Sequence, residues 1–195
     1  VVDYSNPLVE ELKTAQRHNM LTPWSLAERP HPANPIKADI RANASGDETR
    51  FHATMDASAG WEGWFKHWHR TWNSPSPETL IITDDWEIEK GEGAVFHWTT
   101  PLPMRREGDL IIIEGRRGQA EITLPPHTEV EIEELPLLNA DRRAIDEQRR
   151  ELVRYGIKHA TTQPRLTIKQ AGQKGILRIQ VKLMLKKPQA NSAAD

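Results

Sequence analysis

Histidines are the side chains of this sequence best suited to chemistry, and two of them are closely spaced. The eight histidines lie at positions 18, 31, 52, 67, 69, 97, 127 and 159. His67 and His69 flank a tryptophan, and in a β-strand this spacing places both imidazoles on one face. Such a pair suits a metal ion or an anionic sugar, although a metal site needs further ligands. Because the sequence shows no third ligand nearby, two polar side chains on a solvated face are the favoured interpretation.

Acidic residues offer a second kind of chemistry. Asp56, Asp84 and Asp85 fall at the ends of expected strands, and a pair of carboxylates can hydrolyse a glycoside. Nothing in the sequence defines the separation between them. The chain also lacks the HExxH, GxSxG, phosphate-loop and dinucleotide glycine motifs. The sequence therefore gives little support to hydrolase chemistry within this segment.

Tryptophan is unusually frequent, with seven residues against two tyrosines and three phenylalanines. Four of them cluster at Trp61, Trp64, Trp68 and Trp72. An indole face stacks on the apolar face of a pyranose ring, so we predict that Trp61, Trp64 and Trp68 bind a carbohydrate substrate. The alternative is that these large side chains fill a hydrophobic core.

Composition narrows the possible partners. The 195 residues contain 26 Lys and Arg against 28 Asp and Glu, a net charge of −2. This balance favours neither nucleic acid nor a membrane surface as a partner. There are no cysteines, which excludes disulfides and thiolate chemistry, and no apolar run approaches the ~20 residues of a membrane span. The first residues resemble neither an initiator segment nor a signal peptide, so we expect an internal cut or a processed end.

Short alternating segments dominate the rest of the chain and predict β-strands. The expected strands cover residues 36–41, 49–55, 65–72, 79–83, 94–99, 110–114, 119–124, 130–134, 165–169 and 176–185. Glycine-rich turns predict hairpins around residues 115–118 and 171–175.

Two helices interrupt this pattern. An Asn-Pro start at residues 6–7 predicts a short N-terminal helix, and residues 139–155 predict a surface helix inserted between strands. About ten short strands with two peripheral helices indicate an all-β fold, an antiparallel β-sandwich. We expect one domain over residues 1–188 and a flexible tail over 189–195.

The order of several short motifs resembles the heparinase II/III-like polysaccharide lyases, in the β-sandwich portion that follows their (α/α) toroid. Near the entry to the sandwich the resemblance rests on Tyr4 and on His-Asn-Met-Leu at 18–21. Downstream it rests on Met-Asp-Ala-Ser-Ala at 55–59, Arg-Thr-Trp at 70–72, Pro-Ser-Pro at 75–77, Leu-Ile-Ile-Thr-Asp-Asp at 80–85, Phe-His-Trp at 96–98 and the final pair of strands over 165–185.

This resemblance implies a carbon–oxygen lyase that cleaves an acidic, uronate-containing polysaccharide by β-elimination. It implies a zinc ion in the complete protein, with His18 as a metal ligand, and an upstream toroid as a partner domain. The other ligands and the catalytic residues would lie before Val1, so this segment alone would be inactive. A periplasmic or secreted location is also implied.

Two other functions remain open from the sequence. The chain could be a non-catalytic carbohydrate-binding module that uses its tryptophans. It could also have a purely structural role.

Overall fold

The chain folds into two antiparallel β-sheets that pack face to face. A computed structural model describes residues 14–24, 35–136 and 162–186. The shorter sheet has the order β1 (Leu21–Trp24), β6 (Gly93–Thr99), β11 (Thr162–Ala171), β10 (Glu129–Pro136). The longer sheet has the order β2 (Ala42–Gly46), β3 (Phe51–Asp56), β4 (Phe65–Ser76), β5 (Thr79–Ile88), β12 (Lys174–Leu185), β9 (Gly118–Thr123), β8 (Leu110–Glu114), β7 (Met104–Glu107). Two short 3-10 helices, η2 (Ala15–Arg17) and η3 (Ser58–Trp61), precede β1 and β4.

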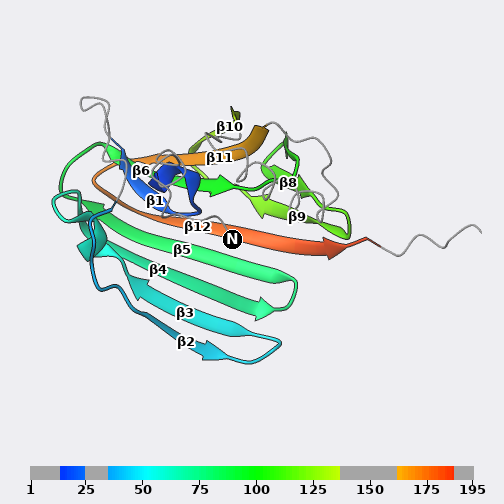
Figure 1. Ribbon diagram of the computed structural model, residues 1–195, viewed down its shortest axis with the longest axis horizontal. Helices are drawn as coiled ribbons and strands as arrows, with labels where there is room; N and C mark the ends of the chain where they lie inside the picture. The colour runs from blue at the N-terminus through cyan, green and yellow to red at the C-terminus, as the bar shows by residue number, and fades with distance from the viewer. Residues whose placement is uncertain (1–13, 25–34, 137–161, 187–195) are drawn as a thin grey trace, which may run out of the picture.

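Both sheets are visible in Figure 1, where β12 runs along the length of the molecule beside β5. The strands β4, β3 and β2 follow on one side, progressively farther from the shorter sheet. The expected antiparallel β-sandwich is therefore confirmed, with twelve strands in the described part of the chain. Within the same ranges, no helix has the length and apolar character needed to cross a membrane.

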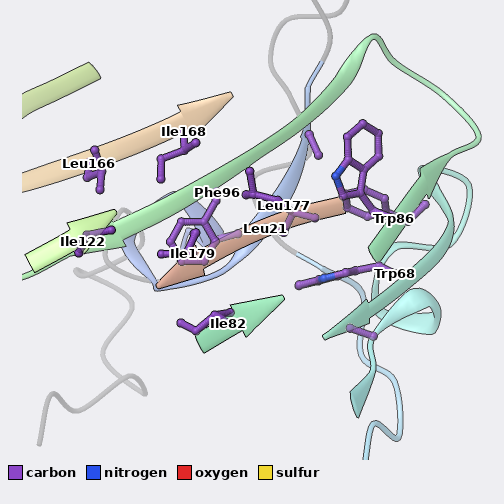
Figure 2. Packing of buried hydrophobic residues seen from close by; sticks show 14 of the residues in the cluster. Leu21, Trp68, Ile82, Trp86, Phe96, Ile122, Leu166, Ile168, Leu177 and Ile179 are labelled. Carbon is purple, nitrogen blue, oxygen red and sulfur yellow. The ribbon is translucent and has the colours of Figure 1, made fainter. Parts of the chain in front are cut away.

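The core lies between the sheets and is built by alternation along the strands. Leu166 and Ile168 of β11 face the longer sheet, and Leu177 and Ile179 of β12 face them from the other side (Figure 2). These side chains are at most 1% exposed. Successive side chains of a strand point to opposite faces, so the alternation along β11 and β12 buries one face of each strand.

An irregularity interrupts the side-chain alternation of β4 near its start. A bulge between Phe65 and His67 shifts the register against β5. Lys66 therefore lies exposed rather than on the face of Trp68, while Phe65 is buried. A bulge places an extra residue in one strand, and this reverses the side-chain order beyond it.

The strand expected over residues 36–41 is wrong. The Ile36 N–H donates to the carbonyl of Gly60 (2.8 Å), and Ile40 packs partly buried against the core beside η3. Ile40 thus packs against η3, whereas Ile36 is 53% exposed, and neither residue joins a sheet. The next strand of the longer sheet is β2, which the sequence analysis missed together with the short strands β1 and β7.

The final pair of strands is real, but the hairpin expected between them is wrong. β11 pairs with β6 and β10 in the shorter sheet, whereas β12 pairs with β5 and β9 in the longer one. The turn between them therefore crosses from one sheet to the other, with Gly172 at a φ of +132°. Both strands carry an apolar face, and placing them in opposite sheets lets the two faces pack against each other.

Two expected helices, over residues 8–13 and 139–155, lie outside the described residues. The division into a domain over 1–188 and a tail over 189–195 stays a prediction.

Candidate functional site

The segment that carries His18 is a compact turn, called here the histidine turn (residues 15–20). It starts as the single 3-10 turn of η2, with Ala15 buried, and ends where Leu21 enters the core as the first residue of β1. The backbone of His18 is extended (φ −117°, ψ 159°), and its N–H donates to the carbonyl of Ala15 (3.1 Å). The His18 carbonyl in turn accepts from the N–H of Met20 (2.9 Å). Buried residues on both sides thus hold the imidazole, itself half-buried, at a defined point of the fold.

The shorter sheet binds the histidine turn through side chains of two strands. Thr99 at the end of β6 donates its hydroxyl to the carbonyl of Arg17 (3.0 Å), and its N–H donates to the side-chain oxygen of Asn19 (2.8 Å). Arg165 of β11 donates to the carbonyl of Gln16 (3.3 Å). The backbone carbonyls of Gln16 and Arg17 lie outside the β-sheets, and these bonds satisfy them.

The longer sheet reaches the same turn through Arg70 of β4. One terminal nitrogen of its guanidinium donates to the carbonyl of Asn19 (3.0 Å). The other donors form a bidentate ion pair with Asp84 of β5, with Nε to Oδ1 at 2.6 Å and Nη2 to Oδ2 at 2.8 Å. The indole N–H of Trp68 also donates to Asp84 Oδ1 (2.7 Å). Arg70 therefore links the histidine turn to a buried charged network.

Burial makes this network stronger than a surface ion pair. The side chains of Arg70 and Asp84 are 4% and 0% exposed. The guanidinium carbon lies 5.3 Å from the ring centroids of Trp68 and Phe96 and 5.7 Å from that of Trp72. Aromatic faces stabilise a cation, and a bidentate carboxylate fixes its orientation. Of the two adjacent aspartates in β5, Asp84 is therefore the partner of Arg70.

The tryptophans predicted to bind substrate occupy different environments. Trp61 and Trp68 are each 2% exposed, which corresponds to the core-packing alternative. Trp64 is half-buried, and the ammonium of Lys90 lies 5.0 Å from its ring centroid. Their role in binding stays a prediction, and among these three Trp64 has the most accessible ring.

The outer face of the longer sheet brings His67 and His69 together, as the sequence spacing predicts. Their ring centroids are 4.2 Å apart. His67 Nε2 lies 3.5 Å from Asp85, and His69 Nε2 lies 3.1 Å from Asp56. The hydroxyl and the N–H of Ser58 donate to Asp56 and, with a smaller contribution from His69, hold the pKa of Asp56 below its ordinary value.

These residues do not by themselves form a metal centre. In the part of the chain that the structure describes, no group of three or more His, Cys, Asp or Glu side chains could hold a metal ion. This holds both for the His67 pair and for His18. Zinc coordination at His18 would thus require ligands from outside the described residues.

Two residues of the histidine turn's surroundings were not singled out from the sequence. Thr99 and Arg165 lie in ordinary strands. Their contacts with the turn join residues at least 80 positions apart in the sequence. No local pattern could have revealed them. The Arg-Thr-Trp motif at 70–72 did indicate Arg70.

The fold is a β-sandwich of unequal sheets, and Arg70 and Arg165 hold the histidine turn against them. No family model matches the chain, and no curated protein matches it in sequence. Among solved structures it is similar to a heparan sulfate lyase HepC mutant from Pedobacter heparinus, with a TM-score of 0.65 and 12% identity, covering 100% of this chain and 30% of that chain. It is also similar to a heparinase III gene product with methylated lysines (TM-score 0.61, 9% identity, 91% of this chain and 25% of that chain). A further heparinase III structure gives a TM-score of 0.58 at 10% identity, covering 90% of this chain and 24% of that one.

This chain therefore spans less than a third of the length of these lyases. The resemblance read from the order of its motifs is confirmed as a resemblance of fold.

Proposed function

We propose that this chain is the β-sandwich segment of a polysaccharide lyase that cleaves a uronate-containing polysaccharide. In this reaction a base removes the C5 proton of the uronate, the bond between C4 and its oxygen breaks, and a C4–C5 double bond forms. An acid protonates the departing oxygen, and neutralisation of the carboxylate stabilises the intermediate enolate. The protein would be periplasmic or secreted, where such polymers occur, and an upstream toroid would supply the catalytic residues.

The observation that carries this proposal is the attachment of the histidine turn to both sheets. Here its carbonyls are bound by Arg70 from the longer sheet and by Thr99 and Arg165 from the shorter one. Functional side chains need this kind of fixed support, because small displacements at a reaction centre lower the rate strongly. The fold similarity to heparinase structures agrees with this assignment.

His18 is the residue of this turn that we assign to the site. A neutral imidazole is a common zinc ligand, and a zinc ion when bound would supply a positive charge near the reacting carbohydrate. In this proposal His18 provides one ligand, and residues outside the described part of the chain provide the others. Arg70 and Thr99 act as positioning residues because they hold the backbone of the turn rather than the substrate.

The test is an ultraviolet assay for unsaturated uronate on a panel of acidic polysaccharides. It compares the parent protein, extended upstream of Val1, with its His18→Ala variant and with the 195-residue chain alone. We expect product from the extended protein, none from the chain alone, and loss of both product formation and bound zinc in His18→Ala. His52→Ala is the matched control, since His52 is exposed on β3, far along the sequence from the turn.

Three outcomes would contradict the proposal. Activity of the chain alone would show that the catalytic residues lie within it. Full activity with retained zinc in His18→Ala would show that His18 is not a zinc ligand. Absence of product on every polymer would favour the binding module instead. In that case the chain alone should bind polysaccharide, and Trp64→Ala should weaken that binding while His18→Ala should not.

A further inference from the structure

Three of the four sheet edges carry features that prevent pairing with another strand. β10 is lined by glutamates, at positions 129, 131, 133 and 134. β7 is short and presents Arg105, Arg106 and Glu107, and β1 is short and contains Pro23. Charges, prolines and short length are the usual protection of an exposed edge.

The fourth edge, β2, carries neither a charge nor a proline. Its sequence is Ala-Asn-Ala-Ser-Gly, all five residues are exposed, and none is charged. β2 is the last strand of the longer sheet and pairs only with β3 among the described strands. Figure 1 shows it at the border of the molecule, farthest from the shorter sheet. An unprotected edge of this kind is suited to accept another strand.

The backbone groups that face outward from this edge can be identified. Asp47 donates its N–H to the carbonyl of Arg50 (2.8 Å), in line with the register that pairs Ala42 with Met55. In an antiparallel ladder the residues bonded to the partner alternate with residues that point away. Asn43 and Ser45 therefore bond to β3, and the N–H and C=O groups of residues 42, 44 and 46 face the free edge.

We propose that β2 pairs antiparallel with β2 of a second copy of this chain, in a two-fold dimer centred on Ala44. In this register Ala44 lies opposite Ala44 of the second copy, and Ala42 lies opposite Gly46. All three are residues whose backbone groups face the edge, so about six new hydrogen bonds form. The two longer sheets become one continuous sheet, and a two-fold axis gives both copies the same contact.

Side chains on the inner face fit this register. Phe51 lies opposite Gly46 within one copy and is 41% exposed. Because Gly46 has no side chain, the Phe51 ring can lie across it and contact Ala42 of the second copy. Small residues in the middle of the interface thus allow close approach, and the exposed ring becomes buried. An exposed large apolar side chain beside an open edge favours such an occupant.

Charges on the outer face select a second copy over an arbitrary strand. Continuing the register by one residue at each end places Arg41 opposite Asp47 of the other copy, and symmetry repeats this pair. Arg41 forms an ion pair with Asp39 (2.9 Å), and both side chains are more than three-quarters exposed. Asp47 accepts from the hydroxyl and N–H of Thr49 and from the N–H of Arg50, which hold its pKa below the ordinary value. Its negative charge is therefore available at neutral pH.

The test is sedimentation velocity on the 195-residue chain over a range of concentrations. We expect a reversible monomer–dimer equilibrium. Ala44→Pro removes an N–H that faces the edge without touching the bonds to β3, and it should raise the dissociation constant at least about tenfold. Arg41→Glu should weaken the dimer through repulsion of Asp47, and Asp47→Asn should weaken it while keeping the acceptor for the turn.

Two matched controls separate dimer loss from misfolding. Arg106→Pro makes the same change at an outward-facing position of β7, the opposite edge of the same sheet. Lys37→Glu makes the same charge change at an exposed residue outside the pairing. Both should dimerise like the unmodified chain, and circular dichroism should show that every variant is folded.

Amide hydrogen exchange gives an independent readout. Raising the protein concentration should slow exchange at Ala42, Ala44 and Gly46, while Asn43 and Ser45 are already protected by β3. A chain that stays monomeric at all concentrations would overturn the proposal. So would a dimer unaffected by Ala44→Pro, or one in which exchange slows elsewhere but not at these three amides.

Discussion

The ion pair of Arg70 and Asp84 gives the strongest prediction for the stability of this fold. Asp84→Asn keeps the shape of the side chain but removes the charge that compensates Arg70. Because Arg70 is only 4% exposed, its guanidinium then stays buried without a counter-charge. Breaking a buried pair in this way costs about 3–5 kcal/mol of unfolding free energy. Stabilities of single domains are about 5–15 kcal/mol, so the loss is a large fraction of the total.

Asp85→Asn is the matched control because it makes the same chemical change one residue away. The side chain of Asp85 is 57% exposed and lies 3.5 Å from His67. Exposed pairs contribute little, so this variant should lose less than about 1 kcal/mol. Urea unfolding followed by tryptophan fluorescence measures both, and Trp68, which donates to Asp84, makes the signal sensitive to this region.

A double variant separates the pair from the shape of the site. Arg70→Met combined with Asp84→Leu removes both charges and fills the space with apolar atoms. We expect it to be more stable than Asp84→Asn, because no uncompensated charge remains. Equal losses of unfolding free energy for Asp84→Asn and Asp85→Asn would refute this account of the network. A double variant less stable than Asp84→Asn would refute it as well.

Two further predictions concern Gly175, at the start of β12, and Ser58, the first residue of η3. Gly175→Ala would bring a methyl group to 2.6 Å from the side-chain oxygen of Gln170 and 2.8 Å from the Trp86 ring, so we expect a loss of about 1–3 kcal/mol in urea unfolding. The NMR signal of the Trp86 indole N–H, which donates to Gln170, should also shift. An unchanged unfolding midpoint would contradict this close packing. Ser58→Ala removes the largest cause of the lowered pKa of Asp56, so NMR titration of its carboxyl group should show that pKa rising toward the ordinary value. A lowered pKa adds stability at pH values above the unfolded-state pKa, and this stability is lost as the pH falls through the folded-state pKa. The variant should therefore lose less stability than the native chain on acidification. Identical stability profiles at acidic pH would argue against the role of Ser58.

Local sequence patterns were sufficient wherever a structural feature depends on neighbouring residues. The alternation in β3, β4, β11 and β12 identified these strands, since alternate side chains must point to opposite faces of any sheet. The glycine-rich turn at 115–118 correctly predicted the hairpin of β8 and β9. The motif order also indicated the fold that the solved heparinase structures share.

Local patterns failed where distant residues decide the outcome. The segment of residues 36–41 has the alternation of a strand, yet its Ile40 packs against η3 and Ile36 stays exposed. β1 is short and contains a proline, so it has no strand signal of its own and forms only because β6 provides its partner. The tryptophan cluster has the composition of a sugar-binding surface, but Trp61 and Trp68 fill the core.

The sequence by itself determined most of the strands and the His-Asn motif of the histidine turn. Only the tertiary structure decided which strands share a sheet, and so separated β11 from β12. It also decided that Arg70, Thr99 and Arg165 meet at one turn. The physical reason is that alternation is a property of consecutive residues, whereas the choice of sheet and the contacts of a turn depend on how the apolar faces of the whole chain pack together.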